Sequence, residues 1–151
     1  MLAFVVLNAF ISQAPEVSAE AQAYGQTQAS LFTAYALPEG KELVVLFAEL
    51  IGSLIFAFTV ASVTSDKKKQ DISVATGIGG GLFAALLIGG SAAAIVSASS
   101  ILNPAVAISL QAFTVTGTNT VWAIAIYVGA ALIGGIAGFA LSSLVEKAKE
   151  K

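Results

Sequence analysis

Three long hydrophobic runs, separated by polar segments, dominate the pattern along the chain. They cover residues 43–63, 72–90 and 121–145. A membrane-spanning helix needs about 20 predominantly apolar residues, and none of the runs shows the period-two alternation of a strand. The pattern therefore predicts an all-α membrane protein whose transmembrane domain, residues 43–145, contains three spanning helices.

A shorter apolar segment, residues 104–113, lies between the second and third runs. At a rise of about 1.5 Å per residue it is half as long as a crossing requires. Asn103 is a natural N-cap, and Pro104 fits the first helical position, where its missing N–H would be unpaired anyway. We also predict Asn119 as the N-cap of the third span. For the segment after Asn103, we predict a re-entrant half-helix that begins at Pro104. An ordinary capped loop-to-helix junction is the alternative.

The two ends of the chain lie outside this domain. Residues 1–42 are predicted to form an N-terminal tail with short apolar or interfacial segments, and residues 146–151 a charged C-terminal tail. The first apolar segment, Leu2–Ile11, is too short to cross a bilayer in the usual way. Because it lacks the basic region of a signal peptide, a retained interfacial segment is favoured over a cleaved or spanning one.

Composition strengthens the membrane interpretation. Hydrophobic residues make up 57% of the 151 residues and charged residues 11%, against roughly 45–50% and about 25% in soluble domains. With seven Lys, no Arg and a net charge of −2, the chain has no basic surface for nucleic acid. The absence of Cys and His excludes thiol catalysis and the usual general base and metal ligands. We expect no enzymatic activity, cofactor or metal site.

The distribution of Lys predicts the orientation in the membrane. Lys67–Lys69 follow the first run and the three C-terminal Lys residues follow the third, so these six lie on one side of a three-span protein and only Lys41 lies on the other. The positive-inside rule places the six on the cytoplasmic side. The N-terminal tail and the loop that contains Asn103 are then expected on the opposite side.

Three motifs occur in a fixed order. Phe47–Ser53 contains Ala-Glu-x-x-Gly, Ile101–Ile108 contains Asn-Pro-Ala, and Tyr127–Gly138 is rich in Gly and Ala. Together they resemble one repeat of the aquaporin and glycerol-channel family, the major intrinsic proteins. The resemblance covers residues 43–145 and implies one half of an aquaporin-like fold.

The resemblance also implies roles for individual residues. Asn103, Pro104 and Ala105 would face the pore and its solute, and Glu49 would accept hydrogen bonds from the loop that carries them. A carboxylate inside a span is costly without such partners. Two glycine pairs at i and i+4 would let helices pack closely, as small residues do in membranes. These glycines are Gly77, Gly81, Gly134 and Gly138.

The chain departs from that family in several respects. It has one Asn-Pro-Ala motif and one repeat, whereas a full channel has two inverted repeats. It also lacks the Arg of family selectivity filters. Ser91–Ser97 is expected to be an extra loop. A pore would need a second half, inserted in the opposite sense, from another copy or a partner membrane protein. The Lys distribution argues against insertion in both senses. Two functions stay open: a passive channel for water or small neutral solutes, and a non-conducting structural subunit of a larger membrane assembly.

Overall fold

The computed structural model describes residues 34–65 and 71–149. These residues form helices and connecting turns without any strand, which confirms the all-α prediction. The segment Leu2–Ile11 and Lys67–Lys69 lie outside the described residues. In chain order the elements are α3 (Glu42–Thr64), α4 (Asp71–Ala94), α5 (Pro104–Ser109), α6 (Thr120–Ile124), the π-helix η2 (Ala125–Ala130) and α7 (Ala131–Lys149).

Three of these helices are long and apolar enough to span a membrane. They are α3 with 23 residues, α4 with 24, and the continuous 30-residue helix that α6, η2 and α7 form together. Large apolar side chains on their outer faces are exposed, among them Phe83 and Ile136, each 71% accessible. A soluble monomer rarely exposes so much apolar surface. The structure thus supports an integral membrane protein, with three candidate spans in the part of the chain that it describes.

Helix α4 is longer than the sequence suggested, because Ser91–Ala94 is helical and not part of a loop. Alanine has the highest helix propensity, and the Ser91 hydroxyl donates to the Leu87 carbonyl one turn earlier. The helix is closed by a Schellman motif, in which Ser97 has φ 57° and the N–H of Ala98 donates to the carbonyl of Ala93 at 3.0 Å. The prediction of an extra loop from Ser91 to Ser97 is therefore wrong for its first four residues.

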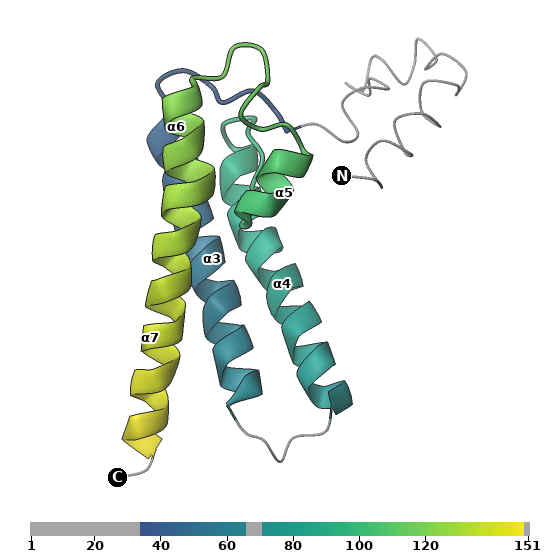
Figure 1. The fold of residues 1–151 in the computed structure, drawn as a ribbon, viewed down its shortest axis with the longest axis vertical. Helices are drawn as coiled ribbons and strands as arrows, with labels where there is room; N and C mark the ends of the chain where they lie inside the picture. The colour runs from purple at the N-terminus through teal and green to yellow at the C-terminus, as the bar shows by residue number, and fades with distance from the viewer. Residues whose placement is uncertain (1–33, 66–70, 150–151) are drawn as a thin grey trace, which may run out of the picture.

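Helix α3 lies in the middle of the bundle, as Figure 1 shows. Both α4 and the α6–η2–α7 helix pack along it, whereas α4 and α7 make few contacts with each other within the described residues. The three spans therefore form an open row in the order α4, α3, α7. Each outer helix keeps an apolar surface that no described part of the chain covers.

On α4, two of the predicted packing glycines face α3. A Cβ atom on Gly77 would lie 2.7 Å from Cγ1 of Val63, and one on Gly81 would lie 2.7 Å from Cβ of Thr59. Real side chains do not approach so closely, so only glycine allows this separation between the two helices without a shift.

The two packing glycines on α7 lie against the other side of α3. A Cβ atom on Gly134 would contact the carbonyl oxygen of Leu50, and one on Gly138 would contact the carbonyl oxygen of Leu54. Backbone atoms cannot move aside as a flexible side chain can. The contact between α3 and α7 therefore depends more strictly on glycine than the contact between α3 and α4.

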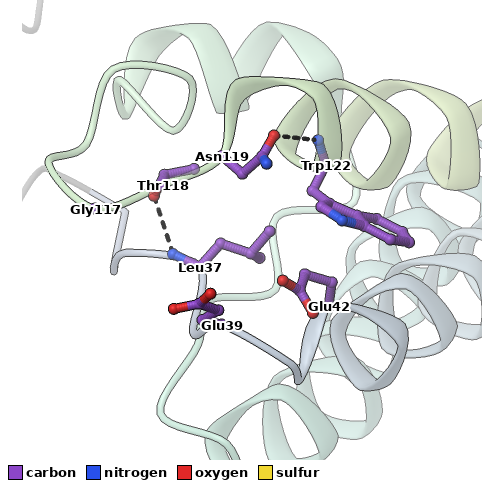
Figure 2. Close-up of a pocket in the computed structure, with 7 residues that line it drawn as sticks. All are labelled: Leu37, Glu39, Glu42, Gly117, Thr118, Asn119 and Trp122. Atoms are coloured by element: carbon purple, nitrogen blue, oxygen red, sulfur yellow. Dashed lines mark hydrogen bonds between the residues drawn. The ribbon is translucent and has the colours of Figure 1, made fainter.

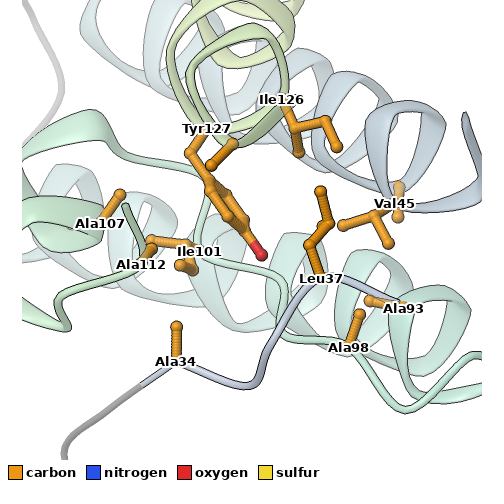
Figure 3. Close-up of a cluster of buried hydrophobic side chains, with 12 residues drawn as sticks. Ala34, Leu37, Val45, Ala93, Ala98, Ile101, Ala107, Ala112, Ile126 and Tyr127 are labelled. Atoms are coloured by element: carbon orange, nitrogen blue, oxygen red, sulfur yellow. The ribbon is translucent and has the colours of Figure 1, made fainter. Parts of the chain in front are cut away.

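At the end where α3 begins, the extended segment 34–37 crosses the bundle and fixes three other segments. Its side chains Ala34 and Leu37 are each only 4% exposed and belong to a buried cluster around Tyr127 and Ile126, which Figure 3 shows. Three of its backbone N–H groups donate hydrogen bonds to distant segments. The Ala34 N–H donates to the Leu110 carbonyl at 2.9 Å, the Tyr35 N–H to Ser99 Oγ at 3.0 Å, and the Leu37 N–H to Thr118 Oγ1 at 3.0 Å. Residues 34–37 thus pack as part of the transmembrane domain.

Candidate functional site

The carboxylate of Glu49 is the most unusual buried group in the described chain. Glu49 lies on α3 and is completely buried. One carboxylate oxygen accepts a hydrogen bond from the N–H of Ile101, and the other accepts one from the N–H of Leu102 at 2.7 Å. Both donors lie in the non-helical segment just before Asn103. A buried carboxylate is costly without partners, and here each oxygen has one.

The spacing between Glu49 and Gly52 has a direct structural reason. Residues three apart share one face of a helix, and this face of α3 meets Leu102. Glu49 binds the Leu102 backbone, and a Cβ atom on Gly52 would collide with the Leu102 side chain. Leu102 has φ 60°, a backbone conformation that costs energy for a residue with a side chain. The two contacts with α3 hold it there.

Asn103 caps α5 as the sequence predicts. Asn103 has an extended backbone, and its side-chain Oδ1 accepts a hydrogen bond from the N–H of Ala105 at 2.8 Å. Pro104 occupies the first turn of α5. Asn103 and Ala105 are exposed and Pro104 is half-buried. The Asn103 side-chain NH₂ group has no partner among residues 34–65 and 71–149, so it can donate a hydrogen bond to another molecule.

Helix α5 is shorter than expected. It ends at Ser109, about 9 Å from its start at 1.5 Å per residue, whereas the apolar pattern suggested a helix through residue 113. Gln111 adopts φ 56°, and the N–H of Ala112 donates to the carbonyl of Ala107 at 2.9 Å. This is a second Schellman closure. Gln at the left-handed position gave no sequence signal, because glycine is the usual residue there.

Asn119 is the N-cap of the third spanning helix, which confirms its prediction. Its Oδ1 accepts hydrogen bonds from the N–H groups of Val121 and Trp122 at 3.0 and 3.4 Å. A polar pocket of about 500 Å³ opens beside this cap, at the end of the bundle where α3 begins (Figure 2). It is lined by Leu37, Glu39, Glu42, Gly117, Thr118, Asn119 and Trp122.

Tyr127, the first residue of the Gly- and Ala-rich motif, is a component of this region to which the sequence assigned no role. It lies in the π-helix η2, and only 1% of its surface is exposed. Its hydroxyl donates a long hydrogen bond, 3.5 Å, to the carbonyl of Ser99. Its ring meets the ring of Phe113 edge to face, with centroids 6.4 Å apart. A local switch from α- to π-helix has no simple sequence signature, so the pattern of apolar residues could not reveal this position.

The site therefore combines a buried carboxylate, a segment with non-helical backbone and a short capped helix. Within residues 34–65 and 71–149, no group of His, Cys, Asp and Glu side chains is placed to hold a metal ion. The arrangement provides hydrogen-bond donors and fixed backbone geometry. Comparisons of the chain with protein-family models, with curated proteins and with solved structures found no match.

Proposed function

We propose that the protein is an aquaporin-like half-channel, which forms a passive path for water or small neutral solutes when it pairs with a second half. The observation that carries this proposal is the pair of hydrogen bonds from Ile101 and Leu102 to Glu49. They fix the segment before Asn103 at one defined depth along α3.

That depth supports a re-entrant segment. Glu49 lies seven residues after the first residue of α3, so it is about 10 Å along the helix axis. If α3 stands upright in a hydrocarbon layer of about 30 Å, Glu49 lies roughly 8 Å inside the boundary. Non-helical backbone is tolerated at such a depth only where it is buried in protein or lines a water-filled cavity. The exposed side of Asn103 and Ala105 therefore requires water or a second protein beside it.

Asn103 is the residue of this segment that faces outward with a free donor. Its Oδ1 is used by the cap and its NH₂ group points to no described partner. A neutral solute can accept a hydrogen bond from this group. Ions should be excluded, because Glu49, the carboxylate that binds the residues just before Asn103, is completely buried with both oxygens hydrogen-bonded and is not free to replace their hydration shell.

The open row of helices supports the need for a second half. Because α4 and α7 both pack on α3 and hardly on each other, residues 34–65 and 71–149 of one copy do not enclose a channel. A partner inserted in the opposite sense would bring its own short helix against α5. We propose that membrane lipid covers the outer faces and that this second half, from another copy or a different protein, covers the Asn103 side.

A non-conducting structural subunit is the second candidate, and the Lys distribution favours it. Six of seven Lys residues lie on one side of a three-span protein, which selects a single orientation. Copies inserted in one orientation can associate only side by side. Their α5 helices could not meet tip to tip, and no pore of the two-half type would form.

The deciding experiment measures permeability of proteoliposomes by stopped-flow light scattering. The channel proposal expects water or glycerol permeability above that of empty liposomes, and a change in that permeability for Asn103→Ala. Asn119→Ala is the matched control, because it removes the same kind of cap, worth about 1 kcal/mol, away from the proposed path. Permeability equal to that of empty liposomes for both solutes would reject the channel and leave the structural subunit.

A further inference from the structure

We propose that Tyr127 is a second positioning residue for the segment 98–103, in addition to Glu49, and that the π-helical turn of η2 brings its hydroxyl to this segment. The proposal deepens the channel function proposed above and rests on it for its effect on permeation. Its structural part concerns only contacts within this chain.

Side chains from two different spanning helices bind the segment before Asn103. Glu49 on α3 binds the N–H groups of Ile101 and Leu102. Tyr127, on the third spanning helix, binds the carbonyl of Ser99. The two side chains therefore fix opposite ends of a four-residue stretch directly before Asn103. Besides the contact with Tyr127, the Ser99 end has the hydrogen bond from Ala98 to Ala93 of α4 and the one that the Tyr35 N–H donates to Ser99 Oγ. Tyr127 adds the contact with the third spanning helix.

The Tyr127 side chain also contacts the segment that follows α5. The Tyr127 ring packs edge to face on Phe113, which lies four residues beyond the end of α5. Tyr127 thus links the segment that enters α5 with the segment that leaves it. A change in its position would shift both ends of the short helix together, and with them Asn103.

The π-helix η2 contains Tyr127 and places it next to Ile126 in the core. In η2, Ile126 and Tyr127 are at most 1% exposed and Ala130 is 3% exposed. A π turn is wider than an α turn, because its hydrogen bonds join residues i and i+5. Ile126 can then pack in the core while Tyr127 reaches Ser99, and π turns often occur at functional sites.

The test compares Tyr127→Phe with Tyr35→Phe in the full chain. Each variant loses one hydroxyl, but the Tyr35 side chain is 62% exposed and its hydroxyl has no partner among the described residues. Both are made in an Ala98→Cys background, which introduces a single thiol into a chain that has no Cys. Ala98 is 6% exposed, so N-ethylmaleimide reacts with the thiol at position 98 only when the segment opens.

We expect Tyr127→Phe to raise the labelling rate of this thiol about two- to fivefold, as suits the loss of one weak hydrogen bond, and Tyr35→Phe to leave it unchanged. 4-Aminophenylalanine at position 127 keeps the ring and restores a donor, so it should bring the rate back toward that of the Ala98→Cys parent. Equal rates for Tyr127→Phe and that parent, or no rescue by the amino group, would overturn the proposal.

Permeation supplies the second measurement. The ratio of glycerol to water permeability does not depend on how many channels are folded, so a merely structural role would leave it unchanged. We expect Tyr127→Phe to shift this ratio and Tyr35→Phe to preserve it. If the protein conducts and Tyr127→Phe changes the labelling rate of the thiol but not the ratio of glycerol to water permeability, the effect on permeation is rejected. If no form conducts, the channel function fails, while the labelling rates still decide whether Tyr127 positions the segment.

Discussion

Replacement of Glu49 by Gln is the most direct perturbation of the site. The amide keeps one oxygen that can accept a hydrogen bond from Ile101 or Leu102, and it presents an NH₂ group to the other N–H. One buried donor therefore loses its acceptor, which costs about 1–3 kcal/mol. Since 1.4 kcal/mol is about a factor of ten in an equilibrium constant, opening of the segment should become roughly 5 to 150 times more favourable.

Hydrogen–deuterium exchange of the Ile101 and Leu102 amide protons measures this opening. Glu49→Gln should accelerate exchange by that factor, and Glu49→Leu should accelerate it further because both donors lose their acceptors. Exchange in the core of α7 should stay unchanged, since its contacts with α3 are not altered. Glu146→Gln and Glu146→Leu are the controls, because Glu146 is exposed near the end of α7.

The melting temperature in detergent provides an independent measurement. A loss of about 2–6 kcal/mol for two unpaired donors should lower it for Glu49→Leu by at least about 5 °C. The Glu146→Leu variant should melt close to the parent protein. Equal melting temperatures for the two Leu variants, together with unchanged amide exchange, would refute the role of Glu49 in holding the segment.

Three further predictions concern packing, capping and orientation. Gly138→Ala should destabilise the bundle by about 1–3 kcal/mol, because the new Cβ would meet the backbone of α3. Gly135→Ala should not, since its Cβ would meet open space. Melting temperatures measure the difference, and equal values for the two variants would contradict the prediction. Asn103→Ala should leave the circular dichroism spectrum unchanged, because a lost cap costs about 1 kcal/mol, and a large loss of helix would contradict this. In oriented vesicles, an impermeant thiol reagent should distinguish Lys68→Cys from Thr118→Cys; equal labelling of both from outside would contradict a single orientation.

The features that follow local rules could be predicted from the sequence. The three spans follow from hydrophobic runs whose lengths match a bilayer. Asn103 and Asn119 were identifiable as caps because an Asn directly before a helix accepts hydrogen bonds from the first N–H groups. The packing of Gly134 and Gly138 on α3 follows the small-residue pattern of membrane helices.

The features that depend on contacts between distant segments could not be predicted in the same way. Gln111 and Ser97 end their helices in the left-handed conformation, although glycine usually takes that position. The contact of Tyr127 with Ser99 depends on a π turn in the middle of an apolar helix. The packing of residues 34–37 depends on acceptors up to 81 positions later in the chain. Only the folded chain brings such partners together.

The separation between Glu49 and its partners has a consequence for synthesis of the protein. The N–H groups of Ile101 and Leu102 come 52 and 53 residues after Glu49. At about 5–20 residues per second, the ribosome adds them roughly 3–10 seconds after Glu49. During that interval there are two possibilities for α3. It enters the bilayer while the carboxyl group of Glu49 has no hydrogen-bond partner, or it stays beside the translocation machinery until Ile101 and Leu102 have been synthesised. Insertion of the first helix and completion of the candidate site are therefore linked in time.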